Sequence, residues 1–203
     1  PQFVSNNHKE GKKVISSIED ELLVCDEFRI SVAFITPSGI TPLLQTLKEL
    51  QNRNIPGKIL TTNYLNFSDP KALEKLSSLT NITLKMYDAD ASGDGFHTKG
   101  YIFRKGEIYR IIIGSSNMTG GALKHNFEWN TKLVSTANGE VSKQIIDEFD
   151  ELWNSPNAKE YSEDFLKSYK EYIEEIQNTI QSKHVEKIFS YEDVVITPNE
   201  MQK

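Results

Sequence analysis

The chain has 203 residues, of which 37% are hydrophobic and 26% are charged, and its formal net charge is -6. This length predicts one sizeable hydrophobic core. A single cysteine, Cys25, excludes an internal disulfide and a cysteine-rich zinc site. No stretch approaches the roughly 18 apolar residues of a membrane span, and the N-terminal part lacks a signal-peptide pattern, so we expect a cytoplasmic protein without membrane contact.

The acidic residues are concentrated in the C-terminal part of the chain. Residues 1–139 hold 16 Lys and Arg against 14 Asp and Glu, whereas residues 140–195 hold 6 against 14. The acidic net charge therefore does not exclude a nucleic-acid site in the first two thirds. The chain begins with Pro1 instead of methionine, which we interpret as processing or excision from a longer chain.

Hydrophobic periodicity predicts alternating helices and strands in the first half of the chain. Asp69 is expected to cap a helix that has Pro70 at its first position. A polar, Gly-containing loop is predicted over residues 88–95. The predicted helices span residues 12–24, 40–50 and 70–79. The predicted strands span residues 28–35, 58–62 and 82–87.

In the second half a hairpin comes first, with strands over 96–103 and 107–114 joined by a turn at 104–106. A further strand and two helical stretches are predicted at 127–136, 141–153 and 161–182. This order predicts an α/β fold in which helices flank a mixed β-sheet, with a C-terminal helical extension. We expect the domain to span residues 1–155, followed by an extension and linker over 156–203.

Four polar residues of the hairpin are predicted to share one site. His97 and Lys99 lie two apart on a predicted strand, so both side chains point to one face. Ser115 and Asn117, at the end of the paired strand, share a face in the same way. The hairpin brings the two pairs together. Imidazole, ammonium, hydroxyl and carboxamide groups suit a tetrahedral oxyanion such as phosphate, with imidazole as nucleophile or proton donor.

The segments FHTKGYIF and IIIGSSNMTGGAL closely resemble the HxK…GSxN signature of the phospholipase D superfamily, in particular its single-motif nuclease members. The resemblance covers roughly residues 28–153 and implies the nuclease-like sandwich of that family. It extends to Glu128 in HNFEWN, where such nucleases carry a glutamate that bonds to the catalytic histidine. The resemblance thus implies His97, Lys99, Ser115, Asn117 and Glu128 as catalytic residues.

The resemblance also implies a metal-independent phosphodiesterase that forms a phosphohistidine on His97. In the superfamily a second histidine protonates the leaving oxygen, and it belongs to a second HxK motif. This chain has one such motif, because His8, His125 and His184 have no lysine two positions later. A homodimer that pairs His97 with its symmetry mate is therefore the implied arrangement. No cofactor or metal is expected for this domain.

One position departs from the longer family pattern HxKxxxxD. Arg104 stands where that pattern has aspartate. We assign Arg104 no catalytic part; with Lys105 and Arg110 it is expected either to contact nucleic-acid backbone or to form a solvated turn.

The C-terminal residues Pro198 to Gln202 are similar to the P-x-x-M-Q entry of a superfamily 2 helicase core. Together with the motifs above, they resemble the phospholipase D-like module that precedes a DEAD/DEAH-type helicase in bacterial multidomain proteins. The resemblance implies a fused helicase as partner, with ATP and magnesium required by that absent core alone.

Two functions remain open from the sequence. The first is a nuclease domain acting on nucleic acid delivered by the fused helicase, with DNA ranked ahead of RNA and both left open. The second is a catalytically weak or inactive targeting module that binds phosphate or DNA. Lipid hydrolysis ranks last, because no amphipathic membrane-binding segment is evident.

Overall fold

The computed structural model describes residues 1–7, 9–63, 68–93, 95–162, 164–165, 167–175 and 178. Residues 1–162 form one compact unit and the residues after them a second, and each is described by itself. In the second unit, residues 164–165 and 167–175 are helical, and the rings of Phe165 and Tyr169 stack at 6.3 Å.

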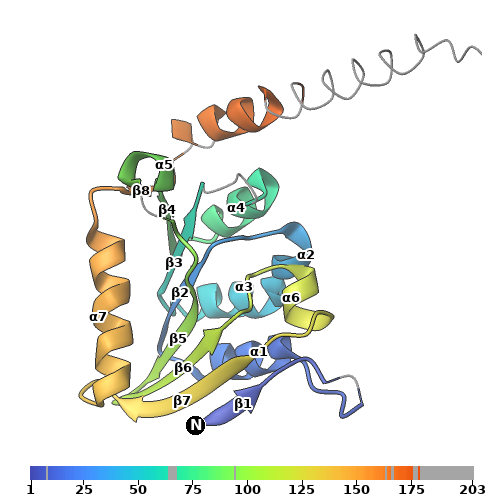
Figure 1. The fold of residues 1–203 in the computed structure, drawn as a ribbon, viewed down its shortest axis with the longest axis vertical. Coiled ribbons are helices and arrows are strands. Elements are labelled where there is room, and N and C mark those ends of the chain that lie inside the picture. Colours follow the sequence, from blue (N-terminus) through green and yellow to red (C-terminus); the bar gives the residue numbers. More distant parts are fainter. Residues whose placement is uncertain are drawn as a thin grey trace, which may run out of the picture. The chain divides into compact units, whose positions relative to one another are not determined.

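An eight-stranded mixed sheet forms the centre of the first unit (Figure 1). The strands lie in the order β1-β7-β6-β5-β2-β3-β4-β8. Strands β2, β3 and β4 run parallel, and every other neighbouring pair is antiparallel. The strand bounds are β1 Gln2–Val4, β2 Glu27–Val32, β3 Gly57–Thr62, β4 Ile82–Tyr87, β5 Lys99–Lys105, β6 Ile108–Gly114, β7 Asn130–Thr136 and β8 Ala158–Glu160.

Helices cover both faces of this sheet. Among the described helices of the first unit, α7 (Glu140–Asn154) lies against one face, and most of the others lie against the opposite face (Figure 1). Those helices are α1 Val14–Val24, α2 Pro37–Ile40, the 3₁₀ helix η1 Thr41–Leu43, α3 Leu44–Asn52, α4 Pro70–Ser77 and α6 Gly120–Lys124. A short helix, α5 (Ala89–Ser92), follows β4.

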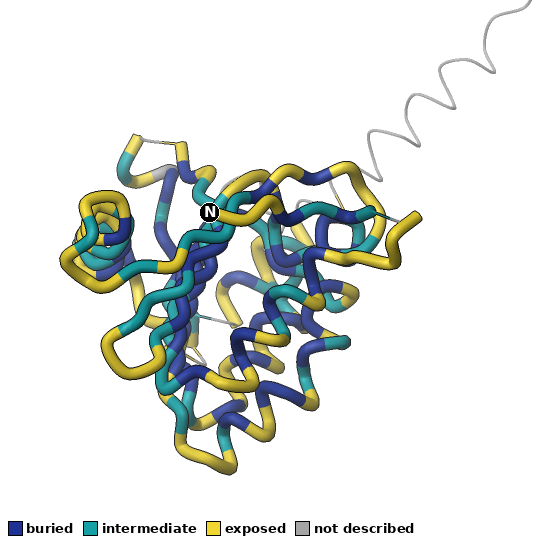
Figure 2. Tube along the Cα trace, turned by 90° about the horizontal axis from the view of Figure 1, so that it is seen from below, coloured by how far each residue is buried: buried dark blue, intermediate teal, exposed yellow. Residues whose placement is uncertain are grey.

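The core has two layers because alternate strand residues point to opposite faces of the sheet. On the α7 face, Phe149 and Trp153 stack with their ring centroids 5.8 Å apart and pack in one cluster with Ile102. On β5, Tyr101 and Phe103 alternate with Ile102 and are buried on the opposite face. Figure 2 shows the buried residues concentrated in the sheet and on the inward sides of the helices.

The predicted α/β fold with a mixed, helix-flanked sheet is confirmed. Asp69 caps α4, since its carboxylate accepts hydrogen bonds from the backbone nitrogens of Lys71 at 2.8 Å and Ala72 at 3.4 Å. Within the described ranges, no helix is both long and apolar enough to cross a bilayer.

Several boundaries differ from the sequence prediction. Strand β5 begins at Lys99 and not at residue 96, because its ladder with β2 ends at the pair Val32 and Lys99. The predicted loop over 88–95 contains α5, which Asp88 caps by accepting a hydrogen bond from Ala91. The short strands β1 and β8 and helix α6 were not predicted. Part of the predicted helix at 161–182 lies outside the described residues. All of the helicase-like residues 196–203 lie outside them.

Candidate active site

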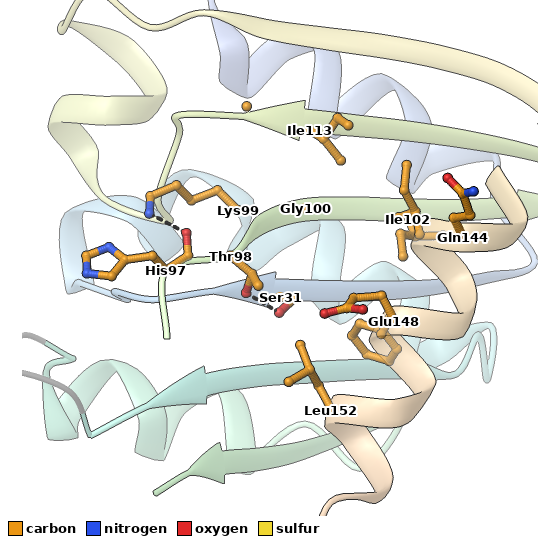
Figure 3. Close-up of a pocket in the computed structure, with 13 residues that line it drawn as sticks. Ser31, His97, Thr98, Lys99, Gly100, Ile102, Ile113, Gln144, Glu148 and Leu152 are labelled. Atoms are coloured by element: carbon orange, nitrogen blue, oxygen red, sulfur yellow. Dashed lines mark hydrogen bonds between the residues drawn. The ribbon is translucent and has the colours of Figure 1, made fainter. Parts of the chain in front are cut away.

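His97 and Lys99 lie where the chain enters β5. Their side chains point to the same side, and Thr98 points away to hydrogen-bond Ser31 at 2.6 Å (Figure 3). The Lys99 ammonium donates to the backbone carbonyl of His97 at 2.6 Å. The exposed imidazole meets the ring of Phe34 edge to face, with the centroids 6.4 Å apart. The predicted alternation of side chains therefore holds, although His97 precedes the strand.

A cavity of about 580 Å³ opens beside these residues. His97, Lys99 and Gly114 line one end, and residues of α7, among them Glu148 and Phe149, line the other. The hairpin register pairs Gly100 with Ile113, so the end of β6 reaches the side of Lys99. The hairpin thus brings the GSSN segment, Gly114 to Asn117, to the HxK segment as the sequence predicted.

Ser115 and Glu128 form the second part of the site. The Ser115 hydroxyl donates a hydrogen bond to the carboxylate of Glu128, which is only 8% exposed. The backbone nitrogen of Trp129 donates to the Ser115 hydroxyl at 3.1 Å, and the Ser115 nitrogen donates to the Trp129 carbonyl at 3.1 Å. These bonds hold the serine and the carboxylate in a fixed mutual orientation.

Asn117 connects the GSSN segment to the chain that follows β2. Its side-chain oxygen accepts a hydrogen bond from the backbone nitrogen of Phe34 at 3.1 Å. The neighbouring Met118 nitrogen donates to the Phe34 carbonyl, also at 3.1 Å. This orientation leaves the carboxamide NH₂ group as the end of Asn117 that can donate to an oxyanion.

Two buried residues that sequence reasoning missed, Asn130 and Tyr101, hold the GSSN segment in place through its Ser116. Asn130 accepts from the Ser116 nitrogen at 3.3 Å and donates to the Ser116 hydroxyl at 2.9 Å, and the Tyr101 hydroxyl donates to the Ser116 carbonyl at 3.0 Å. Asn130, Ser116 and Tyr101 are each at most 3% exposed. The sequence signal was weak: a polar asparagine opens an otherwise ordinary strand, two residues after Glu128.

Burial and charge act on Lys99 in opposite directions. Desolvation by burial lowers the pKa of the Lys99 ammonium, and the negative charge of Glu128 partly offsets that lowering. Burial is also the main cause of the raised pKa of the Tyr101 hydroxyl, and the negative charge of Glu128 raises that pKa further. Tyr101 therefore stays a neutral hydrogen-bond donor.

Hydrogen bonds, one ring contact and the charge of Glu128 relate the five predicted site residues to one another. The Lys99 ammonium bonds to the backbone carbonyl of His97, and the charge of Glu128 acts on Lys99. Glu128 also bonds to Ser115. The Asn117 side chain bonds to the backbone of Phe34, whose ring meets the His97 imidazole. A histidine, an ammonium group and neutral hydrogen-bond donors at one edge of the sheet form a surface that suits a phosphate group.

The basic residues near the hairpin turn have acidic partners. Arg104 pairs with Glu27 at 3.1 Å, Lys105 pairs with Asp26 at 2.7 Å, and Arg110 pairs with Glu21 at 3.4 Å. These pairs favour the structural interpretation of the turn over contact with nucleic-acid backbone.

The mixed sheet, with its HxK and GSxN segments meeting at one edge, defines a phospholipase D-like protein. The family model described as cardiolipin synthase, PLD-like domain, matches residues 25–153, more than half of the chain. The chain belongs to this family. No curated protein matches it in sequence.

Solved structures of low sequence identity share the fold. Nuc, a phospholipase D family member from Salmonella typhimurium, superposes with a TM-score of 0.58 at 17% identity, covering 79% of this chain and 96% of Nuc. NucT from Helicobacter pylori gives a TM-score of 0.60 at 14% identity, with 79% and 98% covered. Polyphosphate kinase from Porphyromonas gingivalis gives 0.54 at 10% identity, with 88% and 29% covered.

Proposed function

We propose that this chain is a metal-independent phosphodiesterase that cleaves nucleic acid, DNA rather than RNA, with His97 as the nucleophile. The observation that carries the proposal is the grouping of the five residues. His97 and Lys99 line one cavity and bond through the His97 backbone carbonyl, and the charge of Glu128, which bonds to Ser115, acts on Lys99. Asn117 bonds to Phe34, whose ring meets the exposed His97 imidazole. The phospholipase D-like fold, shared with Nuc and NucT, supports a phosphodiester substrate.

In the first step a ring nitrogen of His97 attacks phosphorus, so an N–P bond forms and the P–O bond to the leaving oxygen breaks. A second histidine, protonated, gives its proton to that oxygen. Lys99 and the Asn117 carboxamide donate to the non-bridging oxygens, where negative charge develops. In the second step water attacks phosphorus, the second histidine takes the water's proton, and the N–P bond breaks.

The second histidine is supplied by a homodimer in this proposal. The sequence has one HxK motif, so a two-fold axis near His97 would bring the same residue of a second chain to the same phosphate. The exposure of the His97 side chain supports this, because a partner has access to it.

We further propose that this chain is the N-terminal module of an ATP-dependent helicase. The support for this proposal is the sequence of residues 196–203 together with the phospholipase D-like motifs, and residues 196–203 lie outside the described part of the chain. In such a protein the helicase core would separate strands and present them to the phosphodiesterase site.

A phosphate-binding module without turnover is the second candidate. Arg104, at the position of the family aspartate, forms an ion pair with Glu27, so this chain uses that position for a structural contact. Loss of a family residue in this way is compatible with a site that binds phosphate and does not cleave.

His97→Ala decides between the two functions. We expect wild-type protein to cleave an end-labelled DNA oligonucleotide in the presence of EDTA, and His97→Ala to lose at least about a hundredfold in rate, as for removal of a nucleophile or general acid–base group. His125→Ala, a change at another exposed histidine, serves as the matched control with unchanged cleavage. DNA binding without cleavage by the wild type would favour the second candidate, and cleavage that needs added Mg²⁺ would contradict the histidine mechanism.

A further inference from the structure

Two aromatic side chains are exposed beside the candidate active site. Phe3 on β1 is 61% exposed, and Trp129, just before β7, is 76% exposed. Their rings meet edge to face with the centroids 6.1 Å apart. The antiparallel pairing of Phe3 with Thr131 fixes this arrangement, although the two aromatic residues are far apart in the sequence.

Trp129 differs from the other tryptophan in its surroundings. Trp153 is 6% exposed, stacks on Phe149 and belongs to the core cluster. Trp129 leaves most of its indole in solvent, so core packing does not account for so large an apolar ring at this position.

The aromatic pair is continuous with the candidate active site. Phe3 and Trp129 line a cavity of about 320 Å³ together with Ile113 and Gly114. Ile113 and Gly114 also line the cavity that contains His97 and Lys99. The two cavities therefore share a wall. A linear polymer with a phosphate at Lys99 can extend across Gly114 onto the aromatic rings.

The backbone couples Trp129 to the site as well. Trp129 follows Glu128 directly, and its backbone nitrogen and carbonyl both bond to Ser115. The Trp129 backbone is thus held at a fixed place next to the groups assigned to phosphate, which reduces the ordering that binding requires.

We propose that Phe3 and Trp129 form a base-stacking subsite, which holds a nucleobase of a single strand whose phosphate lies at His97 and Lys99. The inference rests on the proposed function and names its substrate class. Exposed aromatic rings beside a cationic phosphate site match a nucleotide, because every base has a flat π face and an anionic backbone. In a duplex both faces of a base are already stacked, so the subsite selects unpaired strands.

Base removal isolates the subsite from the phosphate site. We compare oligothymidylate of about ten nucleotides with an abasic strand of the same length, since single-strand sites span a few to about sixteen nucleotides. Affinity is measured by fluorescence anisotropy with all variants in a His97→Ala background, which keeps the strand intact. Trp129→Ala should weaken oligothymidylate binding about 5- to 150-fold and leave abasic binding within about twofold, as expected for loss of one stacked base.

Matched variants separate stacking from general apolar contact. Trp129→Phe keeps an aromatic face and should retain most of the affinity, whereas Trp129→Leu keeps apolar area and should behave like Trp129→Ala. Phe127→Ala removes an aromatic ring that is 97% exposed but does not line the Phe3–Trp129 cavity, so binding should stay within about twofold. Equal losses on thymidylate and abasic strands, or full retention by Trp129→Leu, would overturn the subsite.

Sedimentation and abasic-strand cleavage distinguish base stacking from a dimer contact and from a catalytic role. If sedimentation shows that Trp129→Ala dissociates a dimer which Trp129→Phe preserves, the rings serve a protein interface and the inference is wrong. With His97 intact, Trp129→Ala should slow cleavage of end-labelled oligothymidylate more than cleavage of the abasic strand, whereas His97→Ala should abolish both. Failure of the wild type to cleave any strand would reject the proposed catalysis, while base-dependent binding through Trp129 would still stand.

Discussion

Lys99 has to satisfy two opposing demands. In the proposed function its ammonium must be charged to hold a phosphate, yet partial burial at the cavity mouth disfavours the charged form and lowers its pKa. Glu128, itself buried and bonded to Ser115, provides the compensating negative charge. The carboxylate therefore has an electrostatic role toward Lys99 in addition to any contact with the histidine.

The alkaline limb of the pH–rate profile should report this balance. Activity requires charged Lys99, so it should fall as pH rises through a pKa below the ordinary range of lysine. In Glu128→Gln the supporting charge is absent and the pKa of Lys99 should fall further, so the limb should move to lower pH. In Lys99→Arg the alkaline limb should move to higher pH, because the arginine guanidinium stays protonated.

Rates for this test are normalised to each variant's own maximum, since Glu128→Gln also changes the bond to Ser115 and lowers the maximal rate. Glu107→Gln on the hairpin turn removes one carboxylate that lies away from Lys99 and serves as the control. An alkaline limb that stays in place in Glu128→Gln would contradict the electrostatic role.

At the scale of elements, the close approach of β6 and β7 forms the site. A Cβ atom on Gly114 would lie 2.6 Å from the Asn130 Cα atom and closer still to the Trp129 carbonyl oxygen. Because both obstacles are backbone atoms in a paired ladder, no side-chain rotation relieves the contact. Glycine is required at this position by the packing of two strands, and this packing places Ser115 against Glu128.

Gly114→Ala should therefore separate the ends of β6 and β7. We expect a loss of about 1–3 kcal/mol in the free energy of unfolding, typical of overpacking, and a larger loss of activity because Ser115, Glu128 and Trp129 shift together. Urea denaturation and DNA cleavage measure the two effects. Gly100→Ala is the matched control, since a Cβ there lies 3.7 Å from an Ile113 methyl group, an ordinary contact. Equal behaviour of the two variants would refute the steric argument.

Local patterns explain which elements the sequence could predict. The apolar stripe of α7 and the Asp69 cap of α4 depend on residues a few positions apart, so they were found. Strands β1 and β8 have three residues each, too few for a period to show, and each exists through a distant partner such as Thr131 for Phe3 or Tyr87 for Ala158. These pairings depend on tertiary contacts between residues that are far apart in the sequence, so a local sequence pattern does not reveal them.

The same distinction applies to the site. His97, Lys99, Ser115 and Asn117 were grouped from strand alternation and the hairpin, and Glu128 came from the family resemblance. The bond between Ser115 and Glu128 and the buried Asn130–Ser116 contact depend on the placement of β7 beside β6, which the sequence pattern does not specify. The Phe3–Trp129 pair was missed for the same reason, because it requires β1 to pair with β7.

At the scale of the whole molecule, the proposed mechanism needs a second proton-transfer group, which the single HxK motif of this chain does not supply. Attack and leaving-group protonation occur on opposite sides of phosphorus, so one imidazole cannot perform both in the same step. The proposed symmetric dimer would supply this group with no further sequence, since each chain would contribute an identical His97 to one shared centre. The dimer and the phosphohistidine mechanism are thus linked, and a test of one constrains the other.

Subunit mixing tests that link. If a shared centre needs His97 from both chains, activity should follow the square of the wild-type fraction when wild type is exchanged with His97→Ala at constant total protein. An equal mixture should then retain about one quarter of the all-wild-type activity, whereas independent sites would retain about one half. Pull-down through a tag on the variant confirms that mixed dimers form, and mixing with His125→Ala should leave activity unchanged. A linear dependence with mixed dimers present would mean that each chain holds a complete site, and the second proton-transfer group would have to lie within the chain itself.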